Sequence, residues 1–323
     1  MDNYKVYNVI DLFFRDKNHY YYYPTSDLYI EYNGVSYKII NENVMIYKIL
    51  SFISRHRHTY TIKTNIKYRI KNIIKRQIKN TPITNSVPES ITIQNILSFF
   101  TPNLFTDKSY SKYFLTCIGD VILKKSNNIY FIPRYIKSFM RQLNKYISIY
   151  FHSINLFRYF KFKYKEHRQD ICRVFKMNEI NLKYVLCPES LFINIICVSI
   201  HYSKRYNSGD DYLLTNDDSY KTDVLWIKDN SHEEIIDHFI KEYIILDSNG
   251  TTICEKDMLY IWNLFVSTSD KINIINKRQC IDILSRKIHM EDGMFMNVSS
   301  AYLPHVKTFK LFWETKWISK TKI

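Results

Sequence analysis

Two adjacent carboxylates, Asp210 and Asp211, stand in the order Ser208-Gly209-Asp210-Asp211. Paired carboxylates on a tight turn hold two divalent metal ions in polymerases and nucleases. In such sites the turn joins buried strands, whereas the residues before Ser208 are polar and basic. We therefore expect an acidic loop that caps the next helix, and we assign no catalytic residue. A metal-dependent nuclease or polymerase relative is the second alternative for the function.

The histidines and the six cysteines are dispersed along the chain and form weak metal motifs. Cys197 and His201 are four residues apart, on one face of a helix, but a zinc site needs four converging ligands and usually a CxxC pair. His232 and His238 are six residues apart, so a helix points them to nearly opposite faces, unlike the two histidines of an HExxH site. We expect buried thiols, ordinary histidines, no metal and no cofactor.

The chain has only five glycines, and they are widely separated. A P-loop or a dinucleotide-binding loop needs closely spaced glycines, because backbone amides must approach the phosphates. This spacing excludes a standard P-loop ATPase, and no GxSxG nucleophile elbow occurs either. Catalysis would require a site dispersed along the sequence. The patterns favour a protein that is not an enzyme and leave the question open.

Positive charge dominates the composition, with 46 Lys and Arg against 31 Asp and Glu, a formal net charge of +15 and a pI near 9.3. Such a balance favours polyanionic partners. The abundance of Ile, Lys, Asn, Tyr and Phe is also typical of an AT-rich genome, which supplies part of the lysine excess. The charge is uneven: ten cations and no acid lie in 43–88, whereas thirteen acids and four lysines lie in 207–257.

The basic tract from Arg55 to Lys79 combines cations with isoleucines. On a helix from about Ile66, isoleucines form one stripe and lysines repeat every four residues beside it, an arrangement that suits a phosphate backbone. A solvated helix face is the equally supported alternative. The predicted nucleic-acid-binding residues in this tract and elsewhere are Arg55, Arg57, Lys63, Lys67, Arg69, Lys71, Lys75, Arg76, Lys79, Lys124, Lys125, Arg134, Lys137, Arg141, Lys277 and Arg278.

The C-terminal part predicts a winged-helix-like unit. A helix over Glu255–Ser267 is followed by a turn, by a second helix over Lys277–Ile288 with Asn276 as its N-cap, and by an extended stretch, Met294–Val298. In this order Lys277 and Arg278 stand at the start of the recognition helix, where base edges and phosphates are contacted. Two plainly packing helices followed by a turn are the alternative.

The remaining patterns indicate an α+β fold that is mostly helical, with a few β-hairpins. The clearest hairpin runs from Leu28 to Ile40 about Asn33-Gly34, and a second is expected about Asn249-Gly250. Further helices are predicted over 42–54, 91–100, 109–125, 133–152, 191–203, 233–243 and 306–317. We expect two domains: a basic α+β domain over 1–180, and a second over 181–323 that holds the acidic segment 207–257 and the helical C-terminal unit. No apolar run is long enough to span a membrane, and no secretory signal is visible at Met1–Lys5.

Several stretches resemble proteins of nucleocytoplasmic large DNA viruses, particularly the mimivirus-like giant viruses. They are Ile30–Glu42, Ser86–Gln94, Lys112–Asp120, His201–Ser208, and Tyr302–Val306 with Phe312–Glu314. This family is without an assigned activity. The resemblance implies a viral protein in the cytoplasm, or in the viral factory, of an infected host cell.

The N-terminal part is also similar to the accessory region that precedes the helicase core of poxvirus-type primase-helicases. In those proteins a hairpin and helices lead to a strand and a P-loop. Ile129–Pro133 occupies the place of that strand, but no Gly-Lys-Ser follows it. This departure removes ATP hydrolysis and leaves an accessory or degenerate relative.

Together these patterns predict a non-catalytic nucleic-acid-binding accessory protein in viral replication or gene expression, which binds backbone phosphates. RNA and DNA remain equally open as ligands, and we expect no membrane association. The first alternative is an interaction scaffold of the viral machinery, in which the acidic segment docks on another viral protein.

Overall fold

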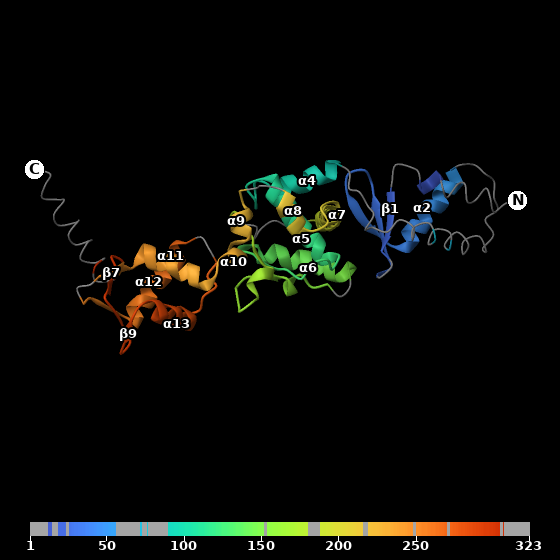
Figure 1. The fold of residues 1–323 in the computed structure, drawn as a ribbon. Coiled ribbons are helices and arrows are strands. Elements are labelled where there is room, and N and C mark those ends of the chain that lie inside the picture. The colour runs from blue at the N-terminus through green and yellow to red at the C-terminus, as the bar shows by residue number, and fades with distance from the viewer. Residues whose placement is uncertain are drawn as a thin grey trace, which may run out of the picture. The chain divides into compact units, whose positions relative to one another are not determined.

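The computed structural model describes residues 12–14, 19–23, 26–55, 72, 76, 90–151, 154–179, 188–215, 219–247, 250–269, 272–303 and 306. Within them the fold is mostly helical with small sheets, which confirms the predicted α+β class (Figure 1). The chain forms two compact units, one from Met1–Phe162 and Phe175–Asp223 and the other from Lys163–Val174 and Val224–Ile323. The expected division between residues 180 and 181 falls within the first unit, because α7 (Glu189–Arg205) packs along α5 (Lys108–Ile122).

The first unit begins with an antiparallel sheet of β1 (His19–Tyr23), β2 (Leu28–Tyr32) and β3 (Tyr37–Ile40), in that order. The predicted hairpin about Asn33-Gly34 is confirmed. Gly34 has a φ of 92°, which a residue without Cβ adopts at no steric cost. The Asn33 side chain accepts hydrogen bonds from the backbone N–H groups of Val35 and Ser36. Helix α2 (Glu42–Arg55) packs its apolar face, including Met45 and Ile49, against tyrosines of this sheet.

Helices make up most of the rest of this unit: α4 (Ser90–Phe100), α5, α6 (Lys137–Tyr150), α7 and α8 (Gly209–Thr215). Helix α5 is buried along nearly its whole length. Strands β4 (Ile129–Phe131) and β5 (Phe160–Lys161) pair in parallel. The short 3-10 turns η3 (Arg134–Ile136) and η4 (Leu156–Arg158) precede α6 and β5. Helix α9 (Lys221–Val224) follows α8.

The second unit contains η5 (Gln169–Ile171), β6 (Cys172–Val174) and α10 (Trp226–Asp229), followed by three longer helices with short strands (Figure 1). The elements follow the order α11 (His232–Tyr243), β8 (Thr252–Cys254), α12 (Glu255–Thr268), α13 (Lys277–Lys287), β9 (Met290–Glu291) and β10 (Met294–Met296). The sheet order is β8-β10-β9, all antiparallel. Helix, strand, helix, helix and a two-stranded wing is the winged-helix arrangement, so the predicted C-terminal unit is present.

The second predicted hairpin is wrong. Strand β7 (Ile245–Leu246) pairs with β11 (Val298–Ser299), and β8 pairs with β10. Gly250 has a φ of 76°, as the predicted turn requires. The strands before and after it, β7 and β8, nevertheless do not pair with each other. Long-range partners prevail because Ile253 and Phe295, which are opposite each other in the β8–β10 pair, are both fully buried. Burial of such side chains outweighs the local turn preference.

The other predicted helices occur with shifted ends, apart from the segment 306–317, of which only Val306 is described. The 3-10 turn η3 (Arg134–Ile136), with Pro133 as its N-cap, precedes α6, and the end of α5 moves from Lys125 to Ile122. The segment Ser86–Glu89, whose sequence fits a capping box before α4, lies outside the described residues.

Candidate nucleic-acid interface

The structure describes only part of the predicted binding residues. Seven of them lie outside the described residues: Arg57, Lys63, Lys67, Arg69, Lys71, Lys75 and Lys79. Arg55, at the end of α2, and Arg76 are exposed. The remaining cations lie after α5, along α6 and at the start of α13.

Helix α6 carries a row of cations along one face. Its buried residues are Phe139, Met140, Leu143 and Ile147, which form the apolar stripe of an amphipathic helix. Opposite this stripe, Lys137, Arg141 and Lys145 are exposed and follow at intervals of four residues. The exposed Arg134 of η3 precedes them on the same side by the 3.6-residue period. The α6 sequence contains no acid.

This row of Arg134, Lys137, Arg141 and Lys145 is called the α6 cation row below. Like charges four residues apart on a helix repel each other. An anion that runs along the helix removes this repulsion. Successive members of the repeat are about 6 Å apart along the axis, from the helical rise of 1.5 Å per residue. The row thus presents a linear array of positive charge, the complement of a phosphodiester backbone.

Two phenylalanines lie beside the α6 cation row. Phe162 is partly exposed, and the Lys137 Nζ lies 5.6 Å from the centroid of its ring, within the range of a cation–π interaction. The ring of Phe157, also partly exposed, is 6.0 Å from that of Phe162. The surface therefore combines cations with aromatic faces. Our sequence-based site list lacked Lys145, Phe157 and Phe162, although cations and aromatics alternate in the stretch Arg158–Lys165.

Lys124 and Lys125 follow the C-terminal end of α5. The Lys125 Nζ donates hydrogen bonds to the carbonyl oxygens of Ser203 (2.8 Å) and Asn207 (3.0 Å). These groups lie at the end of α7, where carbonyls lack partners within the helix. Lys125 thus caps α7, and this role competes with phosphate binding. Lys124 is exposed and has a φ of 55°.

Lys277 and Arg278 are exposed on the first turn of α13, the second helix of the helix-turn-helix in the winged-helix unit. Asn276 caps this helix: its side chain accepts from the Gln279 N–H at 3.0 Å, and the Gln279 side chain accepts from the Asn276 N–H at 3.1 Å. The capping box sets where the helix starts and thereby where both cations stand.

Further along α13 the positive charge is neutralised. Arg286 pairs with Glu233 of α11 at 2.9 Å, and Lys287 pairs with Glu233 and with Asp237, at 3.3 and 2.8 Å. The wing between β9 and β10 carries the exposed Glu291 and Asp292. Among the described residues, the winged-helix unit therefore offers a phosphate the first turn of α13 rather than its wing.

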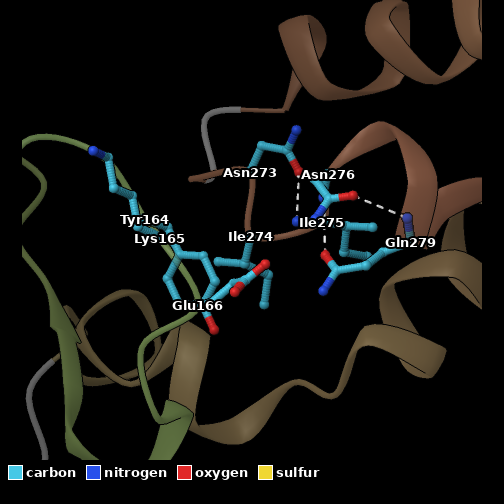
Figure 2. Close-up of a pocket in the computed structure, with 8 residues that line it drawn as sticks. All are labelled: Tyr164, Lys165, Glu166, Asn273, Ile274, Ile275, Asn276 and Gln279. Atoms are coloured by element: carbon cyan, nitrogen blue, oxygen red, sulfur yellow. Dashed lines mark hydrogen bonds between the residues drawn. The ribbon is translucent and has the colours of Figure 1, made fainter.

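An open cavity of about 400 Å³ lies beside the capped end of α13. Figure 2 shows the residues that line it. Its walls are a loop at Tyr164–Glu166 and the segment Asn273–Asn276 with Gln279. Glu166 and Lys165 both belong to the lining residues. In Figure 2 the Lys165 side chain extends away from Asn273–Asn276, whereas the Glu166 carboxylate points toward Ile274. The cavity has no charge preference that would select an anion.

Asp210 and Asp211 lie in the first turn of α8, and Ser208 caps this helix. Ser208 Oγ accepts from the Asp211 N–H at 3.0 Å and donates to the Asp211 Oδ2 at 2.8 Å. Asp210 accepts from the Asn128 side chain at 3.0 Å. The expected acidic loop is therefore the first turn of a helix, and a serine rather than a carboxylate caps it. Among the described residues, no three or more His, Cys, Asp or Glu side chains gather as a metal site.

A third carboxylate, Asp120 of α5, joins this region although nothing in the sequence pairs it with Gly209. It is 1 % exposed, and it accepts hydrogen bonds from the Ser203 hydroxyl at 2.6 Å and the Gly209 N–H at 2.7 Å. Burial raises the pKa of the Asp120 carboxyl above its ordinary value, against the lowering effect of the two hydrogen bonds. Asp120 therefore ties α5 to α7 and α8.

This raised pKa predicts a pH dependence of stability. A carboxyl with a higher pKa in the folded state contributes stability in full below its unfolded pKa of about 3.9, and loses it as the pH rises through the folded pKa. Asp120→Asn keeps an acceptor for the Gly209 N–H and has no charge. Relative to the parent chain, this variant is expected to become more stable, with a larger free energy of unfolding, as the pH rises from 4 to 7. Urea unfolding across that range measures it, and a difference independent of pH would contradict the expectation.

The suspected thiol and histidine motifs are buried or engaged elsewhere. Cys197 and His201 share a face of α7, as predicted; burial raises the pKa of the Cys197 thiol and lowers that of the His201 imidazole. Cys172 donates a hydrogen bond to the Arg168 carbonyl. His238 pairs with Glu242 at 3.3 Å on α11. These contacts fit the interpretation of buried thiols and ordinary histidines.

The second unit thus has the element order and the sheet order of a winged helix, and the first presents a basic and aromatic helix face. Comparison of the whole chain with protein-family models, curated proteins and solved structures found no match. The resemblance to giant-virus proteins therefore stays a prediction. None of the described helices is long and apolar enough to cross a membrane.

Proposed function

We propose that this chain is a nucleic-acid-binding protein without catalysis of its own, which holds a phosphodiester backbone along α6. The observation that carries the proposal is the α6 cation row, in which four exposed cations follow one face of a helix that contains no acid. In line with the sequence resemblance, its role would be accessory to the replication or gene expression of a large DNA virus.

The alternative of an ordinary solvated face is less well supported by this row. A solvated helix face usually alternates cations with acids four residues away, because such pairs stabilise the helix whereas like charges destabilise it. Lys137, Arg141 and Lys145 have no acid four residues away on α6, so no such pair stabilises this helix. Their positions on a helix anchored by four buried side chains keep the charges in line when a ligand arrives.

Binding through the α6 cation row is expected to weaken with salt. Each phosphate contact releases condensed counterions, and four contacts give a log–log slope of about −2.8 on a single strand. Affinity would then fall about 50-fold between 50 and 200 mM salt. Fluorescence anisotropy with labelled DNA and RNA oligonucleotides measures this slope.

The decisive variant is the triple charge reversal Lys137→Glu, Arg141→Glu and Lys145→Glu. It should abolish measurable binding at 200 mM salt. The matched control reverses Lys228, Lys241 and Lys256, which are exposed cations of the acidic segment 207–257, so the net charge changes equally. An equal loss of binding affinity in both variants would show that net charge, and not the α6 cation row, determines binding. No binding by the parent chain at 50 mM salt would overturn the proposal.

A separate variant tests the sequence-based prediction that the tract 55–79 binds nucleic acid. If the joint reversal of Lys67, Lys71, Lys75 and Arg76 to Glu removes binding and the α6 variant does not, nucleic-acid binding stands but its site is the tract. Purified protein that carries a stoichiometric protein partner and shows no nucleic-acid absorbance at 260 nm would favour the scaffold alternative.

A second contact, with duplex DNA, is supported by the winged-helix topology together with the exposed Lys277 and Arg278. Helices in this position lie in the major groove and contact it with their N-terminal residues. Joint replacement of Lys277 and Arg278 by alanine should weaken duplex binding at low salt and leave single-strand binding unchanged. Unchanged duplex binding would remove α13 from the interface.

A further inference from the structure

We propose that the α6 face selects single-stranded nucleic acid, with bases stacked on Phe157 and Phe162 while the α6 cation row holds the phosphates. This inference rests on the proposed function and adds to it the class of ligand. It follows from the placement of two aromatic rings, not from the charge.

The two rings are available as stacking partners. Both are only partly buried. Their centroids are 6.0 Å apart and their planes are tilted by 42° to each other. Every base has a π face, so exposed rings of this kind bind successive bases of a single strand with little sequence preference.

The rings and the cations form one surface. Lys137 links the two groups: it belongs to the α6 cation row, and its Nζ lies 5.6 Å from the centroid of the Phe162 ring. A strand whose phosphate contacts Lys137 therefore brings its neighbouring base within reach of the Phe162 ring. In single-strand binding proteins, the positive groove and the stacking rings are combined in this manner.

Hydrogen bonds hold the segment that carries Phe157 and Phe162 in place beside α6. The Asn144 side chain of α6 accepts from the Leu156 N–H of η4 at 2.7 Å. Lys161 Nζ donates to the Phe157 carbonyl at 2.8 Å, and this bond joins β5 back to η4. Phe160, between the two rings in sequence, is buried. The turn that carries the rings is thereby fixed before a ligand arrives, which lowers the ordering cost of binding.

A duplex cannot use these rings. Its bases are stacked on one another inside the helix and expose only their edges in the grooves, so their faces are inaccessible. The cations would contact either form, because both present phosphates. Stacking thus adds affinity for a single strand alone, and this difference is the measurable consequence.

The experiment uses the full chain and three labelled ligands: a 20-mer of deoxythymidine, an abasic 20-mer with the same phosphates, and a 20-base-pair duplex. The parent chain is expected to bind the thymidine strand roughly tenfold or more tightly than the abasic strand, given a stacking energy of about 1–3 kcal/mol per base. The joint variant Phe157→Leu and Phe162→Leu should remove this preference and leave the abasic and duplex affinities unchanged.

Two further variants control for altered folding. Phe162→Trp keeps a stacking face, so it should retain the preference, and its fluorescence should be quenched by the thymidine strand but not by the abasic one. Tyr206→Leu removes a ring from the other described cation–π pair, with Arg205, at 5.5 Å and away from the α6 cation row. This variant should behave as the parent chain does.

Failure of this inference is distinguishable from failure of the proposed function. If the chain binds all three ligands equally and the triple reversal on α6 removes that binding, phosphate binding stands and stacking is refuted. The same holds if the leucine variant keeps the preference for bases. Absence of binding to every ligand would overturn both.

Discussion

Replacement of Gly119 by alanine is expected to destabilise the first unit by about 3 kcal/mol, the upper part of the usual range for overpacking. A Cβ at this position of α5 would lie 2.1 Å from the Ser199 carbonyl oxygen and 2.7 Å from the Ser203 Cβ, both on α7. The first of these atoms belongs to the backbone, so no rotation of a side chain relieves the overlap. The two helices would have to move apart along their most extensive contact.

Urea unfolding followed by circular dichroism measures the effect as a shift of the transition midpoint. Lys112→Ala on the same helix is the control, because its side chain is only partly buried and alanine favours a helix. A midpoint for Gly119→Ala equal to that of Lys112→Ala would show that α5 and α7 do not approach each other so closely.

Replacement of Trp262 by alanine is expected to destabilise the winged-helix unit by about 3–5 kcal/mol, through lost burial and the cavity that remains. Trp262 of α12 is 1 % exposed. Its ring contacts Phe239 of α11 edge to face at 5.2 Å and Phe265 at 5.4 Å. It is thus the largest side chain that joins the first two helices of the unit.

Hydrogen exchange measures the loss of stability in the Trp262→Ala variant separately for each helix. Protection of the α11 and α13 amides should fall by a factor on the order of 100 or more, because opening of the unit becomes that much easier. Tyr260→Ala is the matched control: the residue lies on the same helix and is 41 % exposed. Unchanged protection in the Trp262 variant would mean that the core of this unit does not depend on the contact between α11 and α12.

Several features could be predicted because their causes are local. The hairpin at Asn33-Gly34 follows from two residues that adopt its turn. The α6 cation row follows from a spacing of four residues, once the helix is known, and the winged-helix order follows from the succession of helix, cap and turn. In each case the interacting groups are only a few residues apart.

Other features depended on contacts between distant segments. Asp120 and Gly209 are joined by a hydrogen bond across 89 residues, and no local pattern marks them as partners. Strand β7 leaves its sequence neighbour β8 and pairs with β11. Lys125 is indistinguishable from Lys124 in the sequence, yet it caps the end of α7. Such long-range contacts depend on the total surface that the folded chain buries, and every helix and strand contributes to that total.

By itself the sequence determined the class of the fold, the turns and helix starts, the uneven charge and the exclusion of a phosphate-binding glycine loop, because each depends on residue types or on spacings within one element. Only the tertiary structure decided which cations share a surface, and that Phe157 and Phe162 lie beside the α6 cation row. It also placed Asp210 and Asp211 in the first turn of α8, where the sequence had suggested an acidic loop. The reason is physical: the direction of a side chain follows from its own element, but its neighbours follow from the packing of elements that are far apart along the chain.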